Sequence, residues 1–257
     1  MLTGRGAVVT GGGRGIGAAV AGALAEAGAR VVVSARSAAE IEAVAAGLRG
    51  RGFDVDAAAC DVSDPAAIER LAATARARLG QVDILVNNAG ISSSAPVRSQ
   101  SLEEWRRLFA VNVEGLFLVT RAFLPGMAER GWGRVVNVAS IAGRTGAPYI
   151  AAYAASKHAV IGFTRACAAE VAARGVTVNA LCPGYVDTPM TDRSIARIVE
   201  KTGRPAEETR RRLLDANPQG RLIEAGEVAF LAVTLCDERA RGVNGQAIGI
   251  DGGAFLG

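Results

Sequence analysis

The chain has 257 residues, half of them hydrophobic and 5% aromatic, and it carries a formal net charge of +4. Its length suffices for one large α/β domain. The arginines are spread along the whole chain, so we predict no concentrated basic face for nucleic acid. Four widely spaced cysteines form no CxxC pair, which argues against a zinc site or a disulfide framework, and we expect no metal site.

The first residues lead directly into a strand-like segment, without a charged and then apolar leader. No apolar run approaches the length of about 18 residues that a membrane span needs. We therefore expect a cytoplasmic protein without a membrane segment.

Short apolar runs alternate with longer amphipathic ones along the chain, and this alternation predicts strands joined by helical crossovers. We predict strands at 7–9, 30–34, 54–60, 82–86, 134–138, 176–181 and 246–250. We predict helices from the glycines at 11–17 to about 27, at 38–48, from 64, at 102–127, 151–173 and 227–236. The predicted fold is α/β, a Rossmann-type doubly wound seven-stranded parallel sheet in a single domain spanning 1–257.

A glycine-rich turn, Thr-Gly-Gly-Gly-Arg-Gly-Ile-Gly at 10–17, joins the first strand to the first helix. Small residues let backbone amides approach a pyrophosphate, and the start of a helix favours an anion there. The turn therefore predicts a dinucleotide site, with contacts from Gly11, Arg14, Gly15, Ile16 and Gly17. A flexible glycine turn is the alternative if this motif is taken alone.

The end of the second strand discriminates between NAD and NADP. A carboxylate there would bind the ribose 2′-hydroxyl of NAD, but Ala35 occupies this position and Arg36 follows it. Two guanidiniums, those of Arg36 and Arg14, can hold a 2′-phosphate through charge-assisted hydrogen bonds. We favour NADP(H) over NAD(H), although Arg36 as a plain surface arginine is the alternative.

Two later segments also end strands at the edge of the sheet where ligands bind in open α/β folds. Asp61 can accept a hydrogen bond from the adenine amino group while Val62 packs on the ring, but Asp61 is equally well explained as a loop cap. Asn88, Ala89 and Gly90 form a small-residue turn after the fourth strand, and we count them as cofactor contacts.

Tyr153 and Lys157 lie four residues apart on a predicted helix, so their side chains share one face. A free phenol has a pKa of about 10, and a neighbouring ammonium, like the positive ring of an oxidised nicotinamide, favours the phenolate. Tyr153 can then act as a general acid or base. A half-buried tyrosine beside a lysine that extends to solvent is the alternative for this pair alone.

Taken together, these motifs resemble those of the short-chain dehydrogenase/reductase family along essentially the whole chain. The matching segments are TGGGRGIG at 10–17, NNAG at 87–90, Asn112, Ser140, YAASK at 153–157 and Pro-Gly at 183–184. The resemblance implies a catalytic tetrad of Asn112, Ser140, Tyr153 and Lys157. In that scheme Ser140 orients the carbonyl, Tyr153 donates the proton, Lys157 binds the nicotinamide ribose, and Asn112 supports a relay water.

The resemblance adds Tyr153 and Lys157 to the expected cofactor contacts, together with Pro183, Gly184, Val186 and Thr188 from the loop after the sixth strand. It also implies a homotetramer, built on the two long helices after the fourth and fifth strands and on the C-terminal strand. These expectations come from the family and not from the composition of the chain.

The segment at about 189–222 is the least family-like part of the chain, and we expect it to cover the substrate. We predict two short helices within it, at 191–201 and 205–216. Its basic side chains outnumber its acidic ones, which fits a substrate with an anionic handle such as a coenzyme A or carrier-protein thioester. A solvated helical face is the alternative.

The leading interpretation is an NADPH-linked reductase of 3-oxoacyl thioesters, and the chain is similar to such reductases and to 3-hydroxybutyrate-type dehydrogenases. An NAD-dependent 3-hydroxyacyl or secondary-alcohol dehydrogenase is the first alternative. A non-catalytic nucleotide-sensing regulator is a third possibility, because a fold alone does not fix function.

Overall fold

The computed structural model describes residues 2–256, and its centre is a seven-stranded sheet in the order β3-β2-β1-β4-β5-β6-β7. All six strand pairs are parallel. The strands are β1 Gly6–Thr10, β2 Arg30–Ala35, β3 Val55–Ala59, β4 Ile84–Asn87, β5 Gly133–Val138, β6 Val176–Pro183 and β7 Ala247–Ile250. The predicted doubly wound parallel sheet is confirmed.

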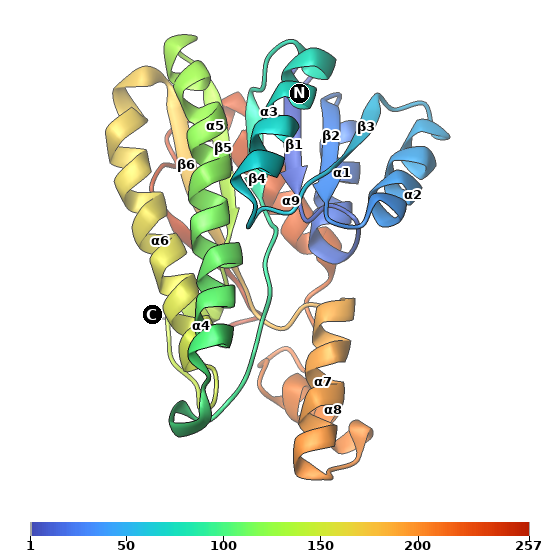
Figure 1. Cartoon of the computed structure of the whole chain (residues 1–257), viewed down its shortest axis with the longest axis vertical. Helices are drawn as coiled ribbons and strands as arrows, with labels where there is room; N and C mark the ends of the chain where they lie inside the picture. The colour runs from blue at the N-terminus through green and yellow to red at the C-terminus, as the bar shows by residue number, and fades with distance from the viewer. Residues whose placement is uncertain (1, 257) are drawn as a thin grey trace.

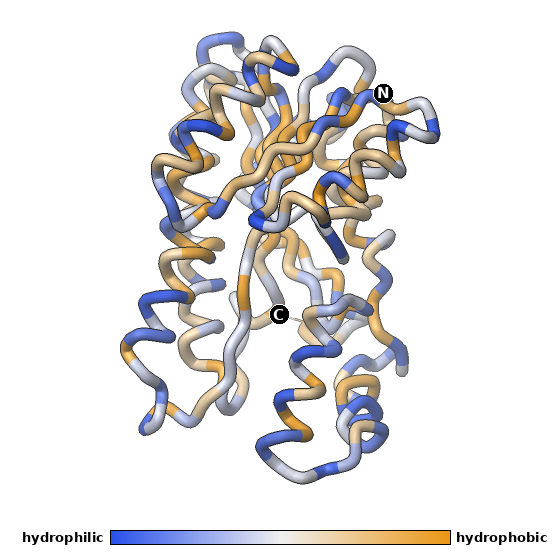
Figure 2. Tube along the Cα trace, turned by 45° about the vertical axis from the view of Figure 1, so that its right-hand side comes forward, coloured by the Kyte–Doolittle hydropathy of each residue, from blue (hydrophilic) through white to orange (hydrophobic). Residues whose placement is uncertain are grey.

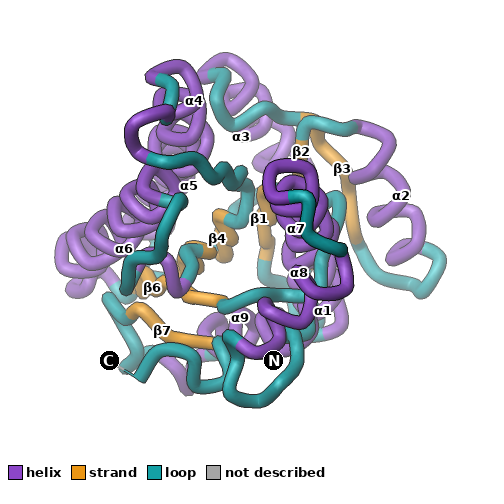
Figure 3. Tube along the Cα trace, turned by 90° about the horizontal axis from the view of Figure 1, so that it is seen from below, coloured by secondary structure: helices purple, strands orange, loops and turns teal. Residues whose placement is uncertain are grey.

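Helices cover both faces of this sheet (Figures 1 and 3). They are α1 Gly15–Glu26, α2 Ala38–Arg49, α3 Pro65–Leu79, α4 Leu102–Phe109, α5 Gly115–Glu129, α6 Ala151–Val171, α7 Pro189–Thr202, α8 Ala206–Asp215 and α9 Ala225–Cys236. Successive side chains of a strand point to opposite faces of the sheet. Alternate strand residues therefore belong to two hydrophobic cores, one on each face. Val9 and Val33 pack with α1, α2 and α9, while Val8 and Val32 pack with α3, α5 and α6.

The helix predicted at 102–127 is continuous over Leu102–Glu129, but a π-helical turn at Ala110–Glu114 separates α4 from α5. Such turns are rare and often occur at functional sites. By length and composition this helix could cross a membrane. Here it packs on the sheet through Leu116, Val119 and Phe123.

The carboxyl ends of the strands all point toward one rim, as the parallel pairing requires. Helices α7 and α8 protrude past this rim on one side, and α4 and the start of α6 extend past it on the other (Figure 1). The tube in Figure 2 is apolar along the strands and more hydrophilic along this protruding segment. Loop residues Val186 and Ile223 pair as an isolated parallel bridge at the base of the segment.

Candidate active site

The glycine turn passes so close to the end of β4 that side chains would not fit. A Cβ on Gly11 would lie 2.8 Å from the Cα of Ala89, and Gly11 has a φ of +65°. A Cβ on Gly17 would lie 2.3 Å from the carbonyl oxygen of Gly11. Arg14, which precedes α1, gives the helix no side-chain cap, so the first N–H groups of α1 are available to an anion.

Thr10 and Asn88 bind the glycine turn to the neighbouring strand end. The Thr10 hydroxyl oxygen accepts hydrogen bonds from the backbone N–H groups of Asn88 and Ala89, each at 3.1 Å. The Asn88 side-chain amide donates to the carbonyl oxygens of Thr10 and Gly11, each at 3.0 Å. The side-chain amide of Asn88, a residue counted as a cofactor contact, therefore stabilises the shape of the glycine turn.

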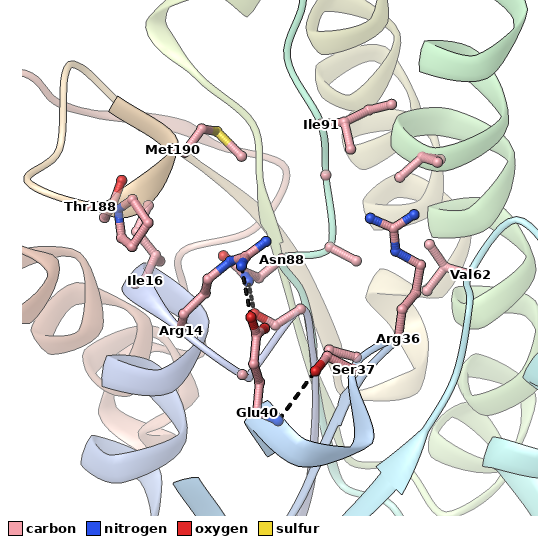
Figure 4. A pocket seen from close by; sticks show the side chains of 18 of the residues that line it. Arg14, Ile16, Arg36, Ser37, Glu40, Val62, Asn88, Ile91, Thr188 and Met190 are labelled. Atoms are coloured by element: carbon pink, nitrogen blue, oxygen red, sulfur yellow. Dashed lines mark hydrogen bonds and ion pairs between the residues drawn. The ribbon is translucent and has the colours of Figure 1, made fainter. Parts of the chain in front are cut away.

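A pocket of about 490 Å³ opens in front of this turn. The predicted cofactor contacts that line it are Gly11, Arg14, Gly15, Ile16, Arg36, Asp61, Val62, Asn88, Ala89, Gly90 and Thr188. Segments as far apart in the chain as Arg14 and Met190 thus meet around one cavity (Figure 4). The bare glycines, the uncapped helix start and the volume of the pocket fit a dinucleotide.

Other predicted contacts lie around this pocket and not on its wall. Gly17 packs beneath the turn. Gly184 donates its N–H to the carbonyl oxygen of Ile250, the last residue of β7, at 3.0 Å. Pro183 pairs with the same strand, and Val186 is buried. Only Thr188 of that loop lines the pocket, where its methyl group would be 3.1 Å from a Cβ on Gly15.

At one end of the pocket, the two arginines expected to read a 2′-phosphate have different surroundings. The guanidinium of Arg14 forms an ion pair with Glu40 of α2, at 2.8 Å. Arg36 extends along the opposite wall near Val62 (Figure 4). Glu40 was not foreseen as a site residue, and the only sequence signal for it was its position three residues after Ser37, the N-cap of α2.

Asp61 caps its loop, as one of the two interpretations of its sequence context predicts, and it also lies on the pocket wall. Its Oδ1 accepts hydrogen bonds from the N–H and the hydroxyl of Ser63, at 2.9 and 2.7 Å, so it caps the loop, and the residue also lines the pocket. Burial acts to raise the pKa of this carboxyl, but the Ser63 hydrogen bonds and the charge of Arg36 lower it overall.

The four residues of the expected tetrad gather beyond the Gly90 end of the pocket. A Cβ on Gly90 would lie 3.3 Å from Oδ1 of Asn112 and 3.6 Å from Nζ of Lys157. The hydroxyl of Tyr153 is hydrogen-bonded to the side chain of Ser140, whose Oγ also accepts from the N–H of Ala142 at 3.1 Å. The expected tetrad therefore adjoins the pocket at Gly90, through Asn112 and Lys157.

Asn112 lies in the π-helical turn and is bonded to the protein at both ends of its amide. Its Oδ1 accepts from the N–H of Ile91 at 2.8 Å, and its Nδ2 donates to the Ile91 carbonyl at 2.9 Å and to Ser156 Oγ at 3.0 Å. Ser156, fully buried within the YAASK motif, was not foreseen as a partner. Asn112 thus fixes the chain next to Gly90 against α6.

Burial controls the protonation of Tyr153 and Lys157. Burial raises the pKa of Tyr153, while the hydrogen bond to Ser140 acts in the lowering direction. Burial also lowers the pKa of Lys157 to about 8, and its Nζ donates to the Val138 carbonyl at 2.8 Å, 5.8 Å from the centre of the Tyr153 ring. The expected lowering of the phenol pKa by Lys157 is therefore not produced by the protein groups alone.

Comparison with known proteins agrees with this architecture. The family model for short chain dehydrogenases matches residues 5–198. The chain is 40% identical to D-β-hydroxybutyrate dehydrogenase of Cupriavidus necator, with 98% of each chain covered. It is 41% identical to the granaticin polyketide synthase putative ketoacyl reductase 1 of Streptomyces violaceoruber, covering 96% of this chain and 92% of that one.

A solved structure of a variant of actinorhodin polyketide ketoreductase with NADPH superposes with a TM-score of 0.95, at 39% identity over 99% of both chains. The chain belongs to the short chain dehydrogenase family. It is an oxidoreductase that uses a nicotinamide cofactor and acts on hydroxyl or keto groups. The predicted class and family are confirmed.

Proposed function

We propose that this enzyme reduces 3-oxoacyl thioesters with NADPH. The observation that carries the proposal is that the hydrogen-bonded Ser140 and Tyr153, with Asn112 and Lys157, adjoin the pocket at Gly90. The far end of this pocket has two arginines and no carboxylate at position 35. Relatives named as ketoacyl reductases, 41% and 39% identical to this chain, support the keto substrate.

When bound, the nicotinamide supplies the hydride that reduces the carbonyl carbon. The chain holds the dinucleotide through the glycine turn, the start of α1 and Thr188. Ser140 holds the substrate oxygen through its hydroxyl, and Tyr153 gives that oxygen the phenolic proton. A raised phenol pKa keeps this proton in place before reaction, which suits a general acid in the reductive direction.

Lys157 and Asn112 support this proton transfer in different ways. In our proposal Lys157 binds the nicotinamide ribose and replaces the proton that Tyr153 loses, since a group with a pKa of about 8 can exchange protons near neutral pH. Asn112 is proposed as a positioning residue. Its remaining Oδ1 lone pair can also hold the relay water that the family resemblance implies.

The thioester part of the proposal depends on the segment at about 189–222, which we propose covers the substrate. Several of its basic side chains already have partners: Arg210 lies near Asp187 and Asp192, and Lys201 donates to the Ser94 carbonyl at 2.9 Å. Arg193 lines the pocket. It is therefore our candidate for contact with an anionic handle.

We also propose a homotetramer in the cytoplasm, by family resemblance. An NAD-dependent dehydrogenase acting on a hydroxyacyl substrate is the second candidate, favoured by the hydroxybutyrate dehydrogenase relative and by the ion pair that occupies Arg14. A nucleotide-sensing regulator would not need the intact tetrad, so we do not favour it.

The test compares acetoacetyl-CoA with free acetoacetate, monitoring NADPH oxidation. We expect kcat/KM to be at least about tenfold higher for the thioester, the effect of one charge-assisted hydrogen bond. Tyr153→Phe should remove most turnover while NADP⁺ still binds, as titration calorimetry would measure. Equal kcat/KM for the two substrates would refute the thioester preference, and near-normal turnover of Tyr153→Phe would refute the proton-transfer role.

A further inference from the structure

The carboxylate of Glu40 lies in the part of the pocket where a 2′-phosphate would be read. Glu40 lines the pocket with Arg14, Ala35, Arg36 and Ser37, and its Oε1 accepts a hydrogen bond from Nη1 of Arg14 at 2.8 Å (Figure 4). We propose that Glu40 sets the strength of the enzyme's discrimination between NADP(H) and NAD(H), by competing with the 2′-phosphate for the guanidinium of Arg14. This inference rests on the proposed dinucleotide site.

The position of Glu40 is fixed by its own helix and by the glycine turn. Ser37 caps α2 by accepting from the N–H of Glu40 at 3.3 Å. Gly13 lets the first turn of α2 approach, because a Cβ there would lie 3.0 Å from the Cβ of Glu40 and 3.2 Å from its Oε2. The carboxylate is therefore held against the turn that would bind the phosphates.

The Arg14–Glu40 pair is suited to competition because it is half-exposed, with side-chain exposures of 49% and 40%. Ion pairs in such surroundings are weak, so a phosphate with a charge of about −1.5 to −2 can displace the carboxylate from Arg14. The displaced carboxylate stays on the same turn of α2 and continues to compete. NAD(H), which lacks the 2′-phosphate, does not need Arg14 to be released.

Within the described residues 2–256, Arg36 forms no direct ion pair like the one between Arg14 and Glu40. It points along the opposite wall (Figure 4), and the carboxyl on which its charge acts is that of Asp61. One of the two cations that would bind a 2′-phosphate is thus held in a direct ion pair, whereas the other interacts with the Asp61 carboxyl without a direct ion pair. This asymmetry predicts that Arg36 is the main source of the preference for NADP(H) over NAD(H), and that Glu40 weakens this preference.

The experiment measures NADP⁺ and NAD⁺ dissociation constants by titration calorimetry for the wild type, Glu40→Gln and Glu42→Gln. Glutamine keeps the size of Glu40 and removes its charge. Glu42, on the same helix and paired with Arg49, is the control. We expect Glu40→Gln to bind NADP⁺ about five- to tenfold more tightly, a charge effect at short range in a partly exposed site, with NAD⁺ changed less than twofold and Glu42→Gln unchanged.

The same titrations in an Arg14→Ala background test the mechanism. There, Glu40→Gln should improve NADP⁺ binding less than twofold. If Glu40→Gln improved NADP⁺ binding as much in this background as in the wild type, competition for Arg14 would be refuted. If Glu40→Gln alone left the NADP⁺ dissociation constant unchanged, or changed the constants of NADP⁺ and NAD⁺ equally, the role of Glu40 would be refuted.

Arg36→Ala separates this inference from the proposed cofactor preference. It should weaken NADP⁺ binding at least about tenfold, the value of a charge-assisted hydrogen bond, and leave NAD⁺ nearly unaffected. Equal losses for both dinucleotides would refute the proposed reading of the 2′-phosphate by Arg36, whereas the Glu40 variants would still decide the role of Glu40. If the wild type bound neither dinucleotide, both proposals would fail.

Discussion

Lys157 is a buried lysine that loses its proton at a lower pH than an exposed lysine does. Its side chain is 6% exposed, its ammonium donates to the Val138 carbonyl, and burial lowers its pKa to about 8. A group that loses its proton near neutral pH can hand protons to a neighbour, whereas an ordinary lysine does not. Burial thus suits Lys157 to its proposed role in proton transfer, and it also lowers the stability of the folded protein.

That cost predicts a pH dependence of folding. The unfolded chain binds the Lys157 proton with a pKa of about 10.4, and the folded chain binds it with a pKa of about 8. Between these values the unfolded state holds more protons, so the free energy of unfolding increases with pH. Below pH 8 both states are protonated and the destabilisation is fully present.

We expect the wild type to gain up to about 3 kcal/mol relative to Lys157→Met between pH 8 and pH 10. Urea denaturation of both proteins across this range measures the difference, and methionine preserves the length of the side chain. A constant difference would show that Lys157 titrates equally in the folded and unfolded chain.

Helix α1 illustrates how an element is fitted to the site it supports. At Gly17 the helix meets the Gly11 carbonyl oxygen, where a Cβ would lie 2.3 Å away, and the Asn88 amide, where it would lie 2.4 Å away. At Gly22, further along the same helix, the nearest atom to an added Cβ is 3.7 Å away, on Leu48. The first glycine is required by packing, and the second is not.

We expect Gly17→Ala to destabilise the protein by about 1–3 kcal/mol through overpacking and to weaken dinucleotide binding, because the glycine turn must move. Gly22→Ala should be neutral or stabilising by up to about 1 kcal/mol, since alanine favours helices. Chemical denaturation and NADP⁺ titration of the two variants make the comparison. Similar effects at both positions would show that Gly17 has no special packing role.

The sequence predicted elements well where their signals were local. The β-branched runs at β2 and β5 and the Asp64–Pro65 start of α3 gave strands and a helix close to those observed. The π-helical turn at Ala110–Glu114 was not predicted. The spacing of apolar residues in the sequence does not distinguish a single π-helical turn from the α-helix around it. The Arg14–Glu40 and Asn112–Ser156 contacts join residues 26 and 44 apart, and only the folded chain brings them together.

At the scale of the whole molecule, apolar side chains on the outer faces of the long helices support the proposed tetramer. Phe117 of α5 is 42% exposed, and its ring meets that of Phe163 of α6 edge to face, with centroids 6.2 Å apart. Large exposed aromatic side chains are typical of protein contact surfaces. These two helices are the ones that the family resemblance assigned to assembly.

We expect Phe117→Glu to convert a tetramer into smaller species, because a carboxylate buried in an apolar contact without a partner is costly. Light scattering coupled to size-exclusion chromatography measures the mass. Val97→Glu, at an apolar site that is 75% exposed and lies outside these helices, should leave the mass unchanged. A tetrameric Phe117→Glu variant would remove the α5–α6 face from the proposed interface, and a monomeric wild type would refute the tetramer.

The bridge between Val186 and Ile223 has a consequence for how such an enzyme can diversify. The N–H of Ile223 donates to the Tyr185 carbonyl at 2.9 Å, and the N–H of Asp187 donates to the Ile223 carbonyl at 2.8 Å. The two ends of the segment that contains α7 and α8 are therefore hydrogen-bonded to each other. Lengthening a loop whose ends are already joined costs little free energy. Insertions, deletions or exchanges between these two residues can therefore remodel the segment proposed to cover the substrate, while α6 and the π-helical turn, which hold Tyr153, Lys157 and Asn112, keep their places.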